Sequence, residues 1–220
     1  MDKFIAACSA AQDADLMLCE SNGVAYQRDM SAGRVPYDAD YLAKCLAYED
    51  SPIAKAVNAG RCALLMRHLP DGASVLDVGA GSGAFVRAAA SWGFDACGFD
   101  VIPDAVKQLR ADGVYAEDLS VFDAVALWDS IEHMEDPSRP LREIRKGSFL
   151  FVSVPVFADL RDIRSSKHYR PGEHLFYWTS QGFINWASLY GFRLLEQSTH
   201  ETDAGRDSIG AFAFCKDLKK

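Results

Sequence analysis

The run Gly79-Ala80-Gly81-Ser82-Gly83 follows the apolar segment 74–78 and precedes a segment whose apolar residues fall on one helical face. A strand that ends in glycines and leads into a helix places backbone N–H groups and a positive helix N-terminus beside a ligand, and glycine permits its close approach. The spacing also satisfies the dinucleotide pattern G-x-G-x-x-G/A, with Asp100 near the distance expected of a ribose-binding acid. These residues predict a nucleotide-like cofactor, but the glycines alone do not decide which one.

Asp77 favours one class of cofactor. It lies inside the otherwise apolar strand, where a buried charge costs several kcal/mol unless it meets a cation or several donors. A sulfonium cofactor with an amino-acid tail would supply these partners, whereas a carboxylate would repel a pyrophosphate. Asp100 can then bind both ribose hydroxyls, and Glu117 and Asp118, after a third strand, can meet an adenine amino group.

Two histidines are candidates for proton transfer. His133 and His174 each follow a glutamate and lie beyond the end of a predicted strand, where open α/β sheets place their ligands. A histidine base contributes about 10² to 10⁴-fold where the acceptor must lose a proton. Glu132 and His133 are suitable metal ligands, but one adjacent pair is weak support for a site, and we expect no metal.

The elements that position these residues alternate between strands and helices. Strands are expected at 74–78, 96–100, 114–116, 122–128 and 149–152, which predicts a parallel sheet with helices on both faces. Residues 155–178 lack a clear period and contain several aromatic residues, so we expect an ordered lid. A helix should follow the N-cap Thr179, and strands at 192–197 and 209–215 should form an antiparallel hairpin across a polar loop, 201–207. Residues 1–60 are expected to form a helical cap, and 61–220 the main domain.

The amino-acid composition limits the possible partners and cellular location of the protein. The chain has 220 residues, 49% of them hydrophobic, and a net charge of −8, which disfavours duplex nucleic acid as a partner. We expect a cytoplasmic protein, because there is neither an apolar run that could span a membrane nor a recognisable leader. The six cysteines form no C-x-x-C pair and are expected to be free thiols.

Three segments together resemble one family. Residues 75–83 (VLDVGAGSG) look like the first motif of class I S-adenosylmethionine-dependent methyltransferases. Residues 122–137 (FDAVALWDSIEHMEDP) are similar to the fourth-strand segment of the branch that includes ubiquinone-biosynthesis and sugar methyltransferases, and residues 173–179 (EHLFYWT) are typical of that branch. The resemblance runs from about residue 60 to the C-terminus and implies a Rossmann-like, seven-stranded, mostly parallel sheet whose last strand is antiparallel.

The resemblance also implies roles for individual residues. It places the glycines at the methionine end of S-adenosylmethionine, Asp77 near its amino group and Asp100 at its ribose. The expected cofactor-binding residues are Asp77, Gly79, Ala80, Gly81, Gly83, Asp100, Val101, Glu117, Asp118 and Trp128. Sugar methyltransferases with a similar Glu-His pair use the histidine as base, which implies His174 as base, assisted by Glu173, with His133 also involved. The expected acceptor-binding residues are Asp129, Tyr169, Arg170 and Tyr177.

The predicted function is methyl transfer to a small-molecule acceptor. A nicotinamide-dependent reductase is the main alternative, although the chain lacks a Tyr-x-x-x-Lys pair for hydride transfer. A cofactor-binding partner subunit without turnover is a third possibility. The identity of the acceptor, the atom that is methylated and the oligomeric state are left open.

Overall fold

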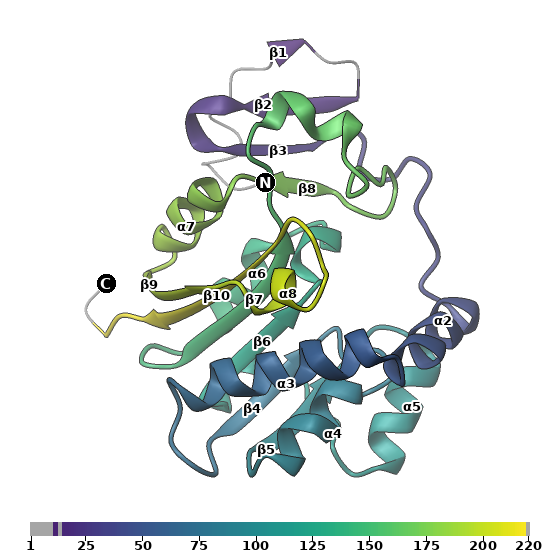
Figure 1. The fold of residues 1–220 in the computed structure, drawn as a ribbon, viewed down its shortest axis with the longest axis vertical. Helices are drawn as coiled ribbons and strands as arrows, with labels where there is room; N and C mark the ends of the chain where they lie inside the picture. The colour runs from purple at the N-terminus through teal and green to yellow at the C-terminus, as the bar shows by residue number, and fades with distance from the viewer. Residues whose placement is uncertain (1–10, 13–14, 219–220) are drawn as a thin grey trace.

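The computed structural model describes residues 11–12 and 15–218, and its centre is a six-stranded mixed sheet (Figure 1). The four strands at one side run parallel, and the last two form the predicted antiparallel hairpin. In spatial order the strands are β5 (Asp95–Phe99), β4 (Ser74–Val78), β6 (Ala124–Trp128), β7 (Phe149–Pro155), β10 (Ile209–Lys216) and β9 (Phe192–Ser198).

Helices cover both faces of this sheet, as the alternation predicted. Because successive strand residues point to opposite faces, Val75 packs in the same core cluster as α3 and α4, while Leu76 packs with α6 and α7. The helices are α2 (Ala39–Glu49), α3 (Pro52–Met66), α4 (Ala84–Ser91), α5 (Pro103–Ala111), α6 (Ser138–Glu143), α7 (Ser180–Ser188) and α8 (His200–Asp203). No helix in the described part of the chain is both long enough and apolar enough to cross a membrane.

The sheet has six strands rather than the predicted seven. The missing strand is the segment 114–116, which forms a single bridge between Gly98 and Tyr115. Immediately afterwards the side chain of Asp118 accepts a hydrogen bond from the backbone N–H of Ser120 and starts the 3₁₀ helix η2 (Leu119–Val121). The segment is therefore too short to form a ladder.

The N-terminal cap is helical only in part. Residues 39–66 form α2 and α3, but residues 11–12, 16–19 and 24–27 form strands of a second, antiparallel sheet instead of the helices that we predicted. In spatial order this sheet contains β1 (Ala11–Gln12), β2 (Leu16–Cys19), β3 (Val24–Gln27) and β8 (Phe176–Trp178). The hairpin β2–β3 turns through η1 (Glu20–Asn22) and Gly23, which has a φ of +63°.

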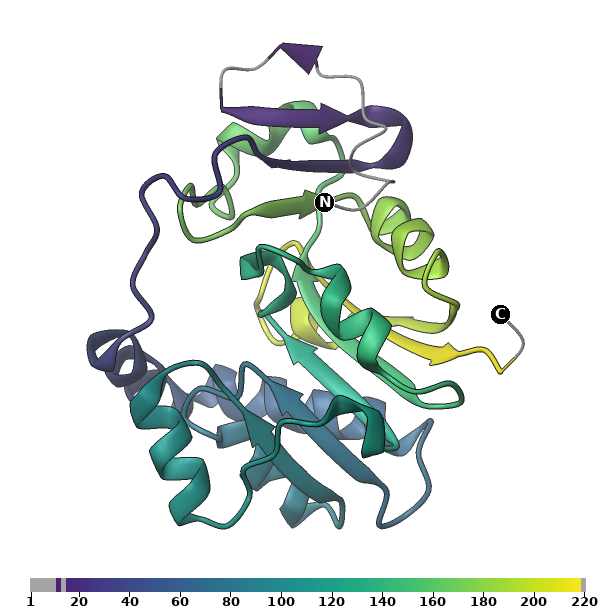
Figure 2. The ribbon, with the colours of Figure 1, turned by 180° about the vertical axis from the view of Figure 1, so that it is seen from behind.

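The second sheet joins the start of the chain to the predicted lid. β3 pairs with β8, and the 3₁₀ helix η4 (Leu160–Ser165) packs against the same strands through Leu160 and Ile163. Figure 2 shows this sheet at the top of the molecule, with α4 and α5 at the opposite end and an extended segment leading down to α2. The lid is thus an ordered part of the fold.

Cysteine usage agrees with the expectation of free thiols for the residues described, which are Cys19, Cys45, Cys62, Cys97 and Cys215. Cys8 lies outside the described residues.

Candidate active site

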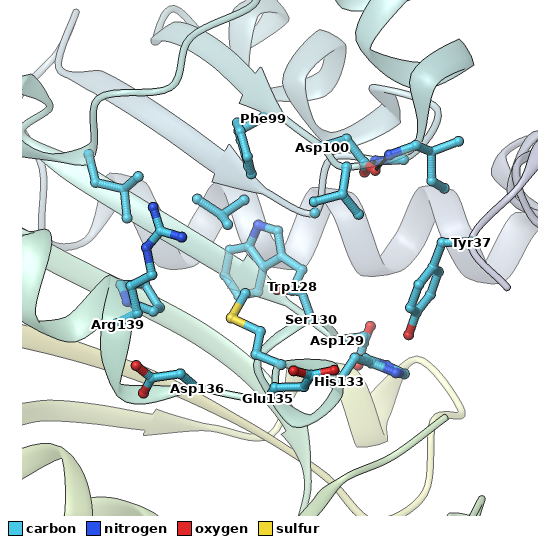
Figure 3. A pocket seen from close by; sticks show the side chains of 18 of the residues that line it. Tyr37, Phe99, Asp100, Trp128, Asp129, Ser130, His133, Glu135, Asp136 and Arg139 are labelled. Carbon is cyan, nitrogen blue, oxygen red and sulfur yellow. Dashed lines mark hydrogen bonds between the residues drawn. The ribbon is translucent and has the colours of Figure 1, made fainter. Parts of the chain in front are cut away.

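A cavity of about 810 Å³ lies at the carboxyl ends of β4, β5 and β6, where open parallel sheets bind their ligands. Eight of the predicted site residues line it, namely Gly79, Gly81, Asp100, Val101, Glu117, Trp128, Asp129 and His133. Figure 3 shows Arg139 at one end, Tyr37 and His133 at the other, and Trp128 between them. A smaller cavity of about 200 Å³ is lined by Asp77 and Ala80 and shares Gly79, Gly81, Trp128 and Asp129 with the larger one.

The glycine turn has the conformation that its sequence predicts. Gly79 has a φ of +88°, and a Cβ atom on it would lie 2.8 Å from Cβ of Ser130, so only glycine fits without movement. The backbone N–H of Gly81 donates to Oδ2 of Asp100 at 2.7 Å. Gly83 is the N-cap residue of α4, with a φ of +75°, and directs the turn into the helix without lining either described cavity.

Asp77 is buried, with 4% of its surface exposed, and its Oδ1 atom has no hydrogen-bond partner within the described residues. Burial raises the pKa of Asp77 to about 7, although the positive charge of Arg61 opposes this increase. An unpaired carboxylate oxygen that borders a cavity fits a cationic group of a ligand, such as the ammonium group of S-adenosylmethionine.

Asp100 has a structural role as well as a place in the cavity wall. Its Oδ1 accepts a hydrogen bond from the N–H of Ile102 at 2.8 Å, while its Oδ2 fixes the glycine turn. Val101 is exposed at the rim, and Glu117 lines the wall, where it accepts a hydrogen bond from the hydroxyl of Tyr115. Asp118 lines neither described cavity, because its carboxylate caps η2.

Asp129 belongs to a buried ionic network that the sequence did not reveal. Its Oδ2 accepts hydrogen bonds from Arg61 and Arg206, each at 2.8 Å, and both arginines also bind Glu201, which has no exposed surface. The two guanidinium groups outweigh burial and hold the pKa of Asp129 below its usual range. Asp129 also has a φ of +52°, an uncommon conformation for a residue other than glycine, at the end of β6.

The loop 201–207 is therefore more than the polar turn that we predicted. It contains most of α8, and Glu201 and Arg206 connect it to α3 and to the end of β6. Arg61 additionally lies 4.9 Å from the ring centre of Trp128, in a cation–π contact on the cavity wall. The contact couples the network to a predicted cofactor-binding residue.

His133 and His174, the two candidate bases, lie in contact, with ring centres 4.7 Å apart. His133 lines the cavity, and its Nδ1 lies 2.9 Å from the carbonyl oxygen of Glu173. His174 lies behind it and is almost fully buried, and burial lowers its pKa to about 3. Together with the buried Glu132, these histidines form a set that could ligate a metal ion.

The predicted acceptor-binding residues of the lid do not line either cavity within the described residues. Tyr177 is 1% exposed, and its hydroxyl donates to the carbonyl of His174 and accepts from Gln27, so it is part of the packing beneath the second sheet. Tyr169 packs on Tyr177, with ring centres 5.9 Å apart. Arg170 is exposed and pairs with the carboxylate of Glu173.

Residues from the N-terminal region form a wall that we did not predict as part of the site. Arg34, Tyr37, Tyr41 and Cys45 all line the larger cavity. The hydroxyl of Tyr37 and Nη1 of Arg34 are buried, and neither has a hydrogen-bond partner in the part of the chain that the structure describes. The spacing of four between Tyr41 and Cys45 was the available signal, and it indicated a helix face without indicating what that face covers.

Comparisons with known proteins identify the family. Residues 53–197 match the family model described as "Methyltransferase domain". Over 120 residues the chain is 30% identical to a ubiquinone biosynthesis O-methyltransferase of Xylella fastidiosa, an alignment that covers 45% of this chain and 49% of that protein. The chain thus spans about half the length of the curated relatives that it matches.

Solved structures share the fold at low sequence identity. A chain of the complex between the Haloferax volcanii Trm112 methyltransferase activator and a methyltransferase superposes with a TM-score of 0.64 at 15% identity, over 82% of this chain and 96% of that one. A Burkholderia thailandensis 1,6-didemethyltoxoflavin-N1-methyltransferase, solved with S-adenosylhomocysteine, gives 0.58 at 14% identity, over 88% and 96%. With the family match, the glycine turn and the unpaired Asp77, these findings show that the chain belongs to the class I S-adenosylmethionine-dependent methyltransferases.

Proposed function

We propose that this chain transfers the methyl group of S-adenosylmethionine to an oxygen atom of a small acceptor by in-line displacement. The observation that supports this most strongly is one continuous cavity. It joins the glycine turn and Asp100 to a second set of polar and aromatic side chains that includes Tyr37 and His133. Such a cavity can bring a cofactor and an acceptor together and exclude water, which is most of what methyl transfer requires of a protein.

In this proposal the cofactor occupies the sheet side of the cavity. The carboxylate of Asp77 would receive the ammonium group, and Asp100 would receive the ribose hydroxyls with lone pairs that its two backbone hydrogen bonds leave available. Phe99, Leu119 and Met134 would pack around the adenine ring. We predicted that Asp118 binds the adenine amino group. Glu117 is the better candidate for this contact, because the carboxylate of Asp118 caps η2.

The acceptor would lie at the end formed by the N-terminal wall. Tyr37 and Tyr41 contact each other edge to face, and Tyr37 also faces the ring of His133, so three aromatic rings border this end. The unpaired hydroxyl of Tyr37 and the unpaired guanidinium nitrogen of Arg34 are hydrogen-bond donors. A planar acceptor with an acidic oxygen fits such a wall, and the O-methyltransferase relatives agree with methylation on oxygen.

The two histidines would promote loss of the acceptor's proton. Only His133 lines the cavity, so the acceptor would meet it first, and His174 would act through it from behind. Burial lowers the pKa of both rings, which keeps them neutral at physiological pH. Glu173, the predicted assistant, would act through its carbonyl group, which binds Nδ1 of His133.

Titration of the purified protein with S-adenosylmethionine, S-adenosylhomocysteine and NADH tests the cofactor assignment. We expect the protein to bind both sulfur compounds and not to bind NADH. We also expect Asp100→Ala to lower the affinity for both sulfur compounds. Binding of NADH alone would overturn the proposal. A screen of phenolic and other hydroxylated acceptors with isotopically labelled cofactor then tests transfer, and a cofactor-binding protein without any turnover would be revealed by the absence of labelled product.

A further inference from the structure

Three side chains with ligand atoms for a metal converge beneath the acceptor end of the cavity. Glu132 and His133 come from the 3₁₀ helix η3 (Ile131–His133), and His174 comes from the segment just before β8. One carboxylate oxygen and one ring nitrogen from each histidine all lie within 4.8 Å of one another. The main chain holds the two segments together, since the N–H of Leu175 donates to the carbonyl of Glu132 at 2.8 Å.

The imidazole of His133 has one nitrogen bound to the main chain, and its other nitrogen faces the carboxylate of Glu132. Nδ1 of His133 pairs with the carbonyl of Glu173, so this nitrogen carries the proton and Nε2 presents a lone pair, 3.7 Å from Oε1 of Glu132. Histidines that bind metals are held in this way, with the second nitrogen hydrogen-bonded to a carbonyl or carboxylate. Nδ1 of His174 is buried and has no hydrogen-bond partner in the described chain.

The carboxylate provides an independent reason to expect a ligand. Glu132 is 1% exposed, and its Oε2 has no hydrogen-bond partner among the residues described. A buried carboxylate without a partner is costly, and no arginine or lysine is paired with it in the described structure. Two ligands of one tetrahedral zinc ion lie about 3.4 Å apart, given bonds of about 2.1 Å, so Glu132 and His133 are already near the required separation.

We propose that Glu132, His133 and His174 form a binding site for one divalent transition-metal ion of the zinc class. Two imidazoles and one carboxylate favour zinc, cobalt or iron over magnesium or calcium, which prefer oxygen ligands. Three protein ligands leave a coordination position open, as catalytic rather than structural zinc sites do. Adjacent Glu132 and His133 gave too little support for this site in the sequence, because the third ligand follows 41 residues later.

The ion would have a use in methyl transfer to oxygen. A divalent cation lowers the pKa of an oxygen that it contacts, and His133 borders the cavity where the acceptor oxygen is proposed to lie. Because a lone pair bound to the ion cannot accept a proton, the two histidines of a metal-loaded site would act as ligands instead of bases, and the ion would favour release of the acceptor's proton to solvent. This use rests on the proposed function, whereas binding of the ion rests only on the positions of the three side chains.

Metal titration of the chelator-treated protein tests the site. We expect one Zn²⁺ per chain by calorimetry, and one Co²⁺ with the visible absorption of a four-coordinate complex. Because loss of a supporting outer partner alone costs about 10- to 100-fold in affinity, His133→Gln and His174→Gln should each weaken binding by at least about 100-fold. His68→Gln is the matched control, since His68 pairs with Glu196 away from the cluster, and it should bind like the original protein.

Absence of saturable binding, or binding that both cluster variants leave unchanged, would overturn the inference. Circular dichroism and S-adenosylhomocysteine affinity of each variant show whether it is folded, and if His174→Gln fails to fold, His133→Gln on the cavity wall gives the same test. Failure of the two proposals can be told apart. Binding of S-adenosylhomocysteine without binding of Zn²⁺ would refute only the metal site. Binding of Zn²⁺ without binding of S-adenosylhomocysteine would refute only the methyl-transfer proposal.

Discussion

Replacement of Glu201 by glutamine should destabilise the protein far more than a single surface change. Glu201 has no exposed surface and binds Arg61 at 2.8 Å and Arg206 at 2.6 Å, while the side chains of these arginines are 10% and 24% exposed. Removal of one partner from a buried ionic group costs about 3 to 5 kcal/mol, because the remaining charges stay buried without compensation. For a domain of this size each kcal/mol lowers the melting temperature by about 2 to 4 °C, so we expect a decrease of about 6 to 20 °C.

Thermal and urea unfolding of Glu201→Gln and a control measure this cost. Asp50→Asn makes the same carboxylate-to-amide change in the exposed pair of Asp50 and Lys55, where the loss should be below about 1 kcal/mol. Equal losses in the two variants would refute the reasoning, since burial would then add nothing to the ionic network.

The pH dependence of this difference follows from the same contacts. The two arginines outweigh burial and hold the pKa of Glu201 far below its ordinary value of 4.5. A depressed pKa stabilises the folded state above that ordinary value, and the contribution is lost as the pH falls towards the folded-state pKa. The stability gap between the original protein and Glu201→Gln should therefore be constant near neutral pH and shrink in acid, and a gap that widened in acid would contradict the assignment.

Three further changes test the cavity. Asp77→Asn should weaken S-adenosylhomocysteine binding by about 10- to 150-fold in calorimetry, because it removes a charge-assisted contact worth about 1.5 to 3 kcal/mol. It should not lower the free energy of unfolding, because it also removes a buried charge that has no partner. Since the pKa of Asp77 is raised to about 7, affinity in the original protein should increase as the pH rises through that value. Gly79→Ala should cost more stability in urea than Gly93→Ala, because both glycines have a positive φ but only at Gly79 would the Cβ meet a neighbour, at 2.8 Å; similar costs would argue against that contact. Tyr37→Phe should raise the KM of an identified acceptor by about 2- to 10-fold and leave the Kd of the cofactor unchanged. A changed cofactor Kd would show that Tyr37 contacts the cofactor instead of the acceptor.

The cofactor half of the molecule was predictable because its signals are local. A strand, three glycines and a helix within 20 residues define the turn, and the position of Asp100 follows from the next strand. Thr179 was identified as an N-cap from its neighbours alone, and its hydroxyl does accept the N–H of Gly182. The terminal hairpin could be recognised because its two strands are adjacent in sequence.

The acceptor half was not predictable, because its contacts join distant segments. Glu201 is 140 residues from Arg61, and His174 is 41 residues from His133, so no spacing rule connects them. Tyr177 has an aromatic ring and a hydroxyl group, as many ligand-binding residues do. In the structure its hydroxyl binds Gln27, which lies 150 residues earlier, so Tyr177 is a buried packing residue instead. The predicted third strand failed for a local reason, since the cap at Asp118 ends it early.

The pairing of β3 with β8 has a consequence for synthesis of the chain on the ribosome. Val24 emerges about 150 residues before its partner Trp178, which at about 5 to 20 residues per second is a delay of about 8 to 30 s. During this interval the edge of the nascent hairpin has unsatisfied N–H and C=O groups that another chain could occupy. Translation speed and chaperone access over this window should therefore influence how much active protein accumulates, even in variants whose final structure is unaltered.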